Sequence, residues 1–187
     1  MRGAIAPVEM DSELLLSQIL EQPDMEGLDL ACGVSTDQPY EVPAVGEERF
    51  HVLAYDFGVK AHSPKMMAER GCRVTVIPAE TTLEEILAAE PDGLFVSNGP
   101  GDPAAVGAAE KAILALAEAD VPIFGICLGH QLICRAFGAR TYKLPFGHHG
   151  GNHPVRNLDR EAVEITSQNH GFSVESGAGD EIPGAPG

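Results

Sequence analysis

Hydrophobic positions change their spacing along the chain, and from residue 50 onward two spacings alternate. Continuous apolar or β-branched runs of four to six residues have the length of buried strands. Between these runs, apolar residues recur every three or four positions, as on one face of a helix. The expected strands are 50–55, 72–77, 93–96 and 121–126, and the expected helices are 63–70, 83–89, 104–119 and 128–137. This alternation predicts a doubly wound, mostly parallel α/β sheet with helices on both faces.

The first 49 residues follow another pattern. Leucine and isoleucine residues about one turn apart predict a helix over 10–22, with Asp11 or Ser12 as its N-cap and Pro23 after its end. Residues 32–48 contain two prolines and two glycines and show no periodicity, so we interpret them as a linker. A single helix cannot bury a core, and we expect residues 1–49 to be a remnant of another domain or an attachment.

The last part of the chain is less regular. After residue 137 the pattern predicts only short segments, at 141–144, 162–167 and 172–174. Residues 176–187 are rich in glycine and proline and predict a disordered tail. The expected organisation is therefore 1–49, then an α/β domain over 50–175, then the tail.

Composition and charge exclude several classes of protein. With 12 basic and 28 acidic residues the formal net charge is −16, and there is no basic cluster of the kind that binds nucleic acid or an anionic membrane surface. The sequence has no run of 18 apolar residues and no secretory signal, so we expect no membrane association. Four cysteines without a Cys-x-x-Cys pair are typical of a cytoplasmic protein with reduced thiols.

The strongest chemical signal is Gly125-Ile-Cys127-Leu-Gly129, which lies between an expected strand and an expected helix. This is the cysteine version of the nucleophile elbow, in which glycines allow a sharp turn that exposes the nucleophile. The helix beginning at Leu128 directs N–H groups at the sulfur, which favours the thiolate and offers one donor to an oxyanion. A buried structural cysteine is the alternative, but the elbow glycines favour a nucleophile.

A second signal, Asn-Gly-Pro-Gly-Asp-Pro over 98–103, follows the third strand. In a parallel sheet this loop lies at the same edge as Cys127, because ligand sites form at the carboxyl ends of the strands. Its exposed N–H groups can supply the second oxyanion donor. The loop has no phosphate-binding lysine, so the sequence does not support a nucleotide site there.

These two motifs resemble those of the class I (triad) glutamine amidotransferases. Three further stretches, 54–60 (AYDFGVK), 146–155 (FGHHGGNHPV) and 168–172 (QNHGF), are similar to the small, glutamine-hydrolysing subunits of carbamoyl phosphate synthetases. The resemblance covers about 50–175 and implies a flavodoxin-like α/β fold. It also implies that 1–49 is a remnant of an amino-terminal domain plus a linker.

The resemblance implies a role for each matching residue. Cys127 attacks the carboxamide carbon of L-glutamine and releases ammonia through a thioester, while the N–H groups of Leu128 and Gly99 form the oxyanion hole. The implied glutamine contacts are Gly99, Gly101, Leu128, Gln131, Asn169, Gly171 and Phe172. The implied partner is a carbamoyl phosphate synthetase large subunit, which uses ATP and a divalent metal. No cofactor is expected in this chain.

The histidines of this sequence do not supply a complete catalytic triad. The chemistry needs a histidine base that is oriented by a carboxylate. In the family both come from a His-Pro-Glu motif, and this sequence lacks that motif. His153 precedes a proline but no glutamate follows, so we assign it no catalytic role. We expect packing for His130 and a role in shaping the pocket for His170. No carboxylate or cysteine accompanies His148, His149 and His153 at ligand spacing, so no metal is expected.

Three interpretations follow. In the first, the chain is a glutamine-hydrolysing subunit that is incomplete at both ends, as a fragment or a frameshifted gene model. In the second, it is an inactive fragment or paralogue that binds glutamine or the partner subunit without turnover. The third, an α/β cysteine hydrolase with another substrate, is disfavoured by the glutamine-contact stretch 168–172.

Overall fold

A computed structural model of the chain describes residues 3–175. The elements lie in the order α1 (Ser12–Glu21), a 3₁₀ turn η1 (Cys32–Val34), β1 (Tyr40–Val42), β2 (Phe50–Tyr55), α2 (His62–Ala68), β3 (Cys72–Ile77), α3 (Leu83–Ala88), β4 (Gly93–Val96), a 3₁₀ turn η2 (Pro103–Ala105), α4 (Ala108–Glu118), β5 (Ile123–Gly125), α5 (Leu128–Ala136), β6 (Thr141–Asn157) and β7 (Ala162–Val174). Three strands, β2, β3 and β4, have the bounds that the sequence predicted.

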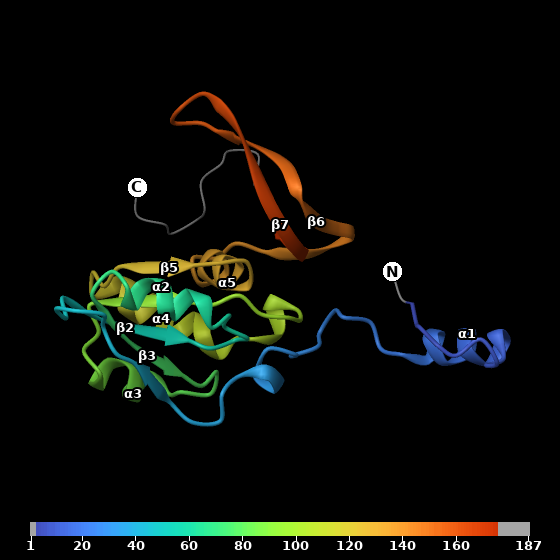
Figure 1. Ribbon diagram of the computed structural model, residues 1–187, viewed down its shortest axis with the longest axis horizontal. Helices are drawn as coiled ribbons and strands as arrows, with labels where there is room; N and C mark the ends of the chain where they lie inside the picture. The colour runs from blue at the N-terminus through green and yellow to red at the C-terminus, as the bar shows by residue number, and fades with distance from the viewer. Residues whose placement is uncertain (1–2, 176–187) are drawn as a thin grey trace.

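The central sheet has the strand order β1-β3-β2-β4-β5 (Figure 1). All its neighbours run parallel except β1, which pairs antiparallel with β3. The first parallel strand, β2, lies in the middle of the sheet, and the strands that follow it are added on both sides. The predicted doubly wound α/β fold is therefore confirmed. The carboxyl ends of the parallel strands meet at one edge.

Alternating side chains of the strands build two cores. On one face, Leu53, Tyr55 and Leu94 are buried against residues of α3, α4 and α5. On the other face, Ala54, Val74, Val76 and Phe95 form a smaller cluster with Met67 of α2. Helices cover both faces, as expected, and the face with three helices holds most of the apolar core.

The amino-terminal helix is confirmed and stands apart from the sheet (Figure 1). Asp11 is its N-cap, and its carboxylate accepts a hydrogen bond from the Glu13 N–H at 2.9 Å. The linker interpretation of 32–48 is wrong in part, because this segment contains η1 and β1. The strand β1 has only three residues at the edge of the sheet, too few to show a period. The division of the chain at residue 49 stays a prediction.

The expected short segments after residue 137 are in fact two long strands that form a hairpin. Strand β6 pairs antiparallel with β7, and the register shifts between Lys143 and His148 and again between Gly150 and His153. These irregularities in the pairing lie in the glycine-containing stretch of β6 that otherwise predicts a break. Gly147 and Gly150, with φ of +72° and +135°, accommodate this bending. The hairpin rises away from the central sheet (Figure 1).

The helix expected over 104–119 starts later in the structure. Asp102 caps the 3₁₀ turn η2, and α4 begins only at Ala108. The tail expected over 176–187 lies outside the described residues. Within residues 3–175, every helix is too short or too polar to cross a membrane.

An ion pair joins α4, α5 and the base of the hairpin. Arg135 Nε lies 2.7 Å from Glu110 Oε1, and both side chains are about three-quarters buried, with 22% and 25% exposed. The Arg135 guanidinium also donates to Thr141 Oγ1, at the start of β6, at 3.4 Å. A mostly buried cation that loses its carboxylate keeps its desolvation cost without compensation.

We therefore expect Glu110→Ala to lower the free energy of unfolding by about 2 kcal/mol. Glu48→Ala is the matched control, because Glu48 pairs with Arg73 at 2.9 Å but is half exposed. Exposed pairs contribute little, so the control should lose less than about 1 kcal/mol. Urea denaturation followed by circular dichroism gives both values, and equal losses would contradict the role given to the Glu110–Arg135 pair.

Candidate active site

Cys127 lies in the sharp turn that the sequence predicted, between β5 and α5. Its φ of +54° and ψ of −108° are unfavourable for a residue with a Cβ atom. Two backbone hydrogen bonds hold the turn, from the Ile126 N–H to the Val96 carbonyl at 3.1 Å and from the Gly129 N–H to the Ile126 carbonyl at 2.9 Å. The surrounding packing therefore holds this strained conformation, in which Cys127 is partly buried.

Gly129 explains how helix α5 comes so close to the sheet. A Cβ atom at this position would collide with the carbonyl oxygen of Val96, at the end of β4. Only glycine allows this approach. The first turn of α5 therefore lies against the carboxyl end of β4, next to the loop over 98–102.

The same close packing extends to Gly99 in that loop. A Cβ atom there would collide with the Phe57 carbonyl oxygen and lie 2.7 Å from Leu128 Cδ2. Gly99 and Leu128 are thus neighbours beside Cys127. The Gly99 N–H donates to no atom of residues 3–175, and the Leu128 N–H interacts with the Cys127 sulfur. The Leu128 N–H is therefore directed at the sulfur, whereas the Gly99 N–H is left without a hydrogen-bond acceptor in this part of the chain.

Two buried carboxylates shape the loops around the site, and the sequence analysis did not identify them. Asp56 Oδ1 accepts hydrogen bonds from the N–H groups of Gly58 at 2.8 Å and Val59 at 2.7 Å, while its Oδ2 accepts from Thr36 N–H at 2.9 Å. An aspartate directly after a strand is the signal that could have indicated this capped turn.

Asp102 acts in the same way on the neighbouring loop. Its Oδ1 accepts from the Ala104 N–H at 2.8 Å and its Oδ2 from the Gly27 N–H at 2.8 Å. Asn98 donates its side-chain amide to the Gly58 carbonyl at 2.8 Å, which joins the two loops. The loops after β2 and β4 therefore form one hydrogen-bonded unit beside Cys127.

Strand β7 closes the site from the other side. The Cys127 thiol donates to the Asn169 carbonyl at 3.6 Å, and Gln131 Nε2 donates to the Phe172 carbonyl at 2.7 Å. Gln131 and Phe172 are buried, whereas the Asn169 side chain is exposed and its Oδ1 lies 2.9 Å from His149 Nδ1. The hairpin thus carries part of the site.

The structure brings together most of the predicted site residues. Cys127, Leu128 and Gly99 are adjacent, and hydrogen bonds link α5 and its N-cap to Asn169 and Phe172. Two predicted residues have other neighbours. Gly101, with φ of +95°, packs against the backbone of Leu28 and Leu30, and Gly171 faces the Lys143 side chain.

The ionisation of Cys127 differs from the expectation that the helix end favours the thiolate. Burial raises the pKa of the Cys127 thiol, and this effect outweighs the Leu128 N–H and the Lys60 ammonium, which both lower it. Burial also raises the pKa of Cys134, and it raises the pKa of Cys32 to about 11. The predicted helix effect is present but smaller than desolvation, and Lys60 is a contributor that the sequence analysis missed.

None of the described histidines hydrogen-bonds to the Cys127 sulfur. Both ring nitrogens of His130 lie 3.8 to 3.9 Å from Cys134 Sγ, and burial followed by the charge of His170 lowers the His130 pKa. His170 has both nitrogens occupied, by the Phe172 carbonyl at 2.8 Å and by Gln168 at 3.0 Å. Neither imidazole is therefore hydrogen-bonded to the Cys127 thiol, and His170 has no free ring nitrogen.

The remaining histidines lie along the hairpin. The ring of His148 contacts those of His153 and His170, with centroids 5.6 and 5.0 Å apart. His153 is paired with Thr166 beyond the second bulge. In the described part of the chain, no three histidine, cysteine or carboxylate side chains are arranged to hold a metal ion.

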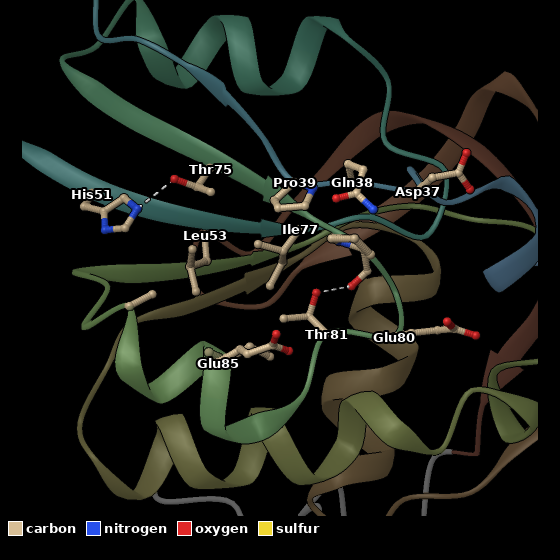
Figure 2. Close-up of a pocket in the computed structure, with 13 residues that line it drawn as sticks. Asp37, Gln38, Pro39, His51, Leu53, Thr75, Ile77, Glu80, Thr81 and Glu85 are labelled. Atoms are coloured by element: carbon tan, nitrogen blue, oxygen red, sulfur yellow. Dashed lines mark hydrogen bonds between the residues drawn. The ribbon is translucent and has the colours of Figure 1, made fainter.

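A separate hollow of about 420 Å³ lies between α3 and strands β2 and β3 (Figure 2). Its floor is apolar, with Leu53, Ile77 and Ile86. Two of its polar side chains bond to a neighbour or to the backbone. His51 Nε2 lies 2.9 Å from Thr75 Oγ1, and the Thr81 hydroxyl donates to the Pro78 carbonyl at 2.7 Å. This hollow has no residue in common with the Cys127 site.

Comparisons with known proteins bear on this site. The family described as glutamine amidotransferase class-I matches residues 53–184. The carbamoyl phosphate synthase small chain of Chlorobaculum tepidum is 50% identical over 186 residues, which are 98% of this chain and 50% of that protein. The corresponding Salmonella typhimurium protein is 47% identical over 193 residues, with 96% and 50% covered. The chain spans about half the length of these relatives.

Solved structures agree with the fold. A glutamine amidotransferase of Thermotoga maritima superposes with a TM-score of 0.51 at 17% identity, with 69% of this chain and 64% of that chain covered. A GMP synthase component from Thermoplasma acidophilum gives a TM-score of 0.52 at 24% identity, with 69% and 68% covered. At such identities these likenesses bear on the fold alone.

The Lys60 contribution to Cys127 can be tested by alkylation. We expect the rate of iodoacetamide labelling at Cys127 to keep rising above pH ~8.5, because burial raises its pKa above the usual range. Lys60→Met removes a cation that favours the thiolate, so labelling at pH ~8 should slow by about 2- to 5-fold. Peptide mapping by mass spectrometry measures the rates. Lys65→Met, on α2, is the control, and equal slowing in both variants would refute the specific effect.

Proposed function

The chain belongs to the class I glutamine amidotransferase family, and from that premise we propose that it carries the glutamine-hydrolysing site of a carbamoyl phosphate synthase small chain. The observation that supports this most is the strained turn at Cys127, with the N–H groups of Leu128 and Gly99 beside it. The length and identity of the match to small-chain relatives support the choice of this branch of the family.

In the proposed reaction the Cys127 thiolate attacks the carboxamide carbon of glutamine. The carbonyl oxygen becomes an oxyanion that accepts hydrogen bonds from Leu128 and Gly99, two preorganised backbone donors. When the carbon–nitrogen bond breaks, the nitrogen takes up a proton and leaves as ammonia, and a thioester remains on Cys127. Water then cleaves the thioester and gives glutamate.

We assign the positioning of glutamine to strand β7 and helix α5. The exposed Asn169 amide has both a donor and an acceptor for the amino acid head group, and its orientation is set by His149. The Gln131 side-chain nitrogen donates to the Phe172 carbonyl. The side-chain oxygen of Gln131 is left to accept a hydrogen bond from the substrate. Gln131 therefore also orders the strand that carries Asn169. We keep Gly101 and Gly171 as proposed glutamine contacts on the family resemblance alone, since they pack against the backbone of Leu28 and Leu30 and against the Lys143 side chain.

The ammonia would pass to a large chain, which consumes it together with bicarbonate and ATP. The relatives are named small chains, and this supports a large chain as the partner.

The four free cysteines support a reducing compartment, and we propose the cytoplasm.

Recognition of glutamine can be tested without turnover. A chloroketone analogue of glutamine should add one equivalent at Cys127, and free glutamine should protect the thiol, because the elbow, both oxyanion donors and Asn169 are present. Asn169→Ala should weaken protection by about 10-fold, the loss expected for a hydrogen-bonded substrate contact. Intact-mass spectrometry follows the adduct. Cys127→Ser is the control, and labelling that glutamine does not affect would reject the proposed pocket.

Turnover by this chain alone should be slow. Neither an imidazole nor a carboxylate bonds to the Cys127 sulfur among residues 3–175, and loss of the base from a catalytic triad costs roughly 10⁶-fold in rate. A coupled glutamate assay on purified protein gives the rate. A value near ~1 s⁻¹, which is ordinary for an enzyme, would show that one of the hairpin histidines acts as the base.

A further inference from the structure

Ser97 is a fully buried polar residue that directly follows strand β4, in the loop beside Cys127. Its Oγ accepts a hydrogen bond from the Phe57 N–H at 2.9 Å and lies 2.9 Å from the Asn98 carbonyl oxygen. An amide N–H can only donate and a carbonyl oxygen can only accept, so the direction of both hydrogen bonds is fixed. The hydroxyl hydrogen of Ser97 is therefore donated to the Asn98 carbonyl.

That carbonyl belongs to the same peptide unit as the Gly99 N–H. All peptide bonds in the described part of the chain are trans, and in a trans peptide the C=O and N–H groups point in opposite directions. A group that holds the Asn98 carbonyl therefore also sets the direction of the Gly99 N–H. Since this N–H has no acceptor among residues 3–175, the peptide is held by its carbonyl end.

A glycine at this position needs such a restraint, because without a Cβ atom its backbone can adopt many conformations. If the peptide turned its carbonyl toward Cys127, the Ser97 hydroxyl would lose its acceptor inside the protein, and an unsatisfied buried donor is costly. The Asn98 side chain adds a second restraint, since its Nδ2 donates to the Gly58 carbonyl at 2.8 Å. The orientation seen in the structure is therefore the favoured one.

The direction of the Gly99 N–H matters for chemistry more than for binding. Oxyanion donors accelerate a reaction because they are aimed in advance at the oxygen on which charge develops. An N–H that samples several directions must be reoriented during the reaction and stabilises the transition state less. Interactions that strengthen in the transition state change the rate of the chemical step rather than substrate affinity.

Resting on the proposed function, we propose that Ser97 is a positioning residue for glutamine hydrolysis. By holding the Asn98 carbonyl, the Ser97 hydroxyl keeps the Gly99 N–H directed at the carboxamide oxygen of glutamine. The hydroxyl itself does not touch the substrate and acts through the peptide that it holds. Its loss therefore slows attack by Cys127 more than it weakens glutamine binding.

Ser35 offers a matched control, because it has the same bonding pattern in another part of the molecule. Its Oγ accepts a hydrogen bond from the Ala79 N–H at 2.8 Å and lies 3.5 Å from the carbonyl oxygen of the next residue, Thr36. Ser97→Ala and Ser35→Ala each remove one hydroxyl with these two kinds of partner. Only Ser97 holds the peptide that carries the Gly99 N–H.

The experiment labels Cys127 in the wild type, Ser97→Ala, Ser35→Ala and Ser97→Thr with two reagents. The chloroketone analogue of glutamine has a carbonyl oxygen for the two N–H donors, whereas iodoacetamide is attacked at carbon without forming an oxyanion. Mass spectrometry gives the rates, and a series of chloroketone concentrations separates the maximal labelling rate from the apparent affinity. Urea midpoints report on folding. A crystal structure of the wild-type chloroketone adduct shows the orientation of the peptide directly.

We expect Ser97→Ala to lower the maximal chloroketone rate by about 10-fold, while its apparent affinity and its iodoacetamide rate stay within about 2-fold of the wild type. Complete loss of an oxyanion donor costs about 10²- to 10³-fold, and here the N–H remains but is less well directed. Ser35→Ala should keep the wild-type labelling rates, although its urea midpoint falls about as much as that of Ser97→Ala. Ser97→Thr retains the hydroxyl and should recover most of the chloroketone rate.

Several results would overturn the proposal. If Ser97→Ala is labelled like the wild type, or is slowed equally with both reagents, Ser97 has only a structural role while the proposed function stands. If Ser97→Ala does not fold, the adduct structure decides, and a peptide that is not bonded to the Ser97 hydroxyl rejects the proposal. If glutamine does not protect the wild type from the chloroketone, the proposed function itself fails, and the role of Ser97 is rejected with it.

Discussion

The approach of helix α5 to the end of strand β4 is the constraint on which the rest of the site depends. The missing Cβ of Gly129 allows the helix to contact the Val96 carbonyl, and Cys127, in the turn between β5 and this helix, has a positive φ. The same approach brings Leu128 beside Gly99 and places Gln131 under strand β7. A single steric condition thus positions the nucleophile, the two N–H groups and the hairpin.

Burial at this contact disfavours ionisation of the Cys127 thiol. The packing that holds the sulfur at the site also removes much of its water, and this raises the pKa of Cys127 despite a helix end and a nearby ammonium. The elbow and the first turn of α5 therefore do not by themselves lower the pKa of this thiol below its ordinary value.

The sequence was informative where burial imposes a regular pattern. Strands β2 to β4 are continuous apolar runs, and their bounds were predicted to the residue. Strand β1 was missed because three edge residues carry no period, and the hairpin was fragmented because its bulges contain the glycines that usually end strands. Cys127, Leu128 and Gly99 were found from local motifs. Asp56 and Asp102 also bind partners 20 and 75 residues away, and no local motif shows these long-range hydrogen bonds.

Asp102 also ties the amino-terminal segment to the active-site loop. It accepts from the Gly27 N–H, its own N–H donates to the Leu28 carbonyl at 3.1 Å, and Gly101 packs on the same backbone. Helix α1 lies beyond this clamp and has no buried residue. Mechanical tension applied to α1 would therefore first load the hydrogen bonds of Asp102, one loop away from Cys127. Anchoring the protein to a solid support through its amino end thus pulls on the loop that Asp102 caps.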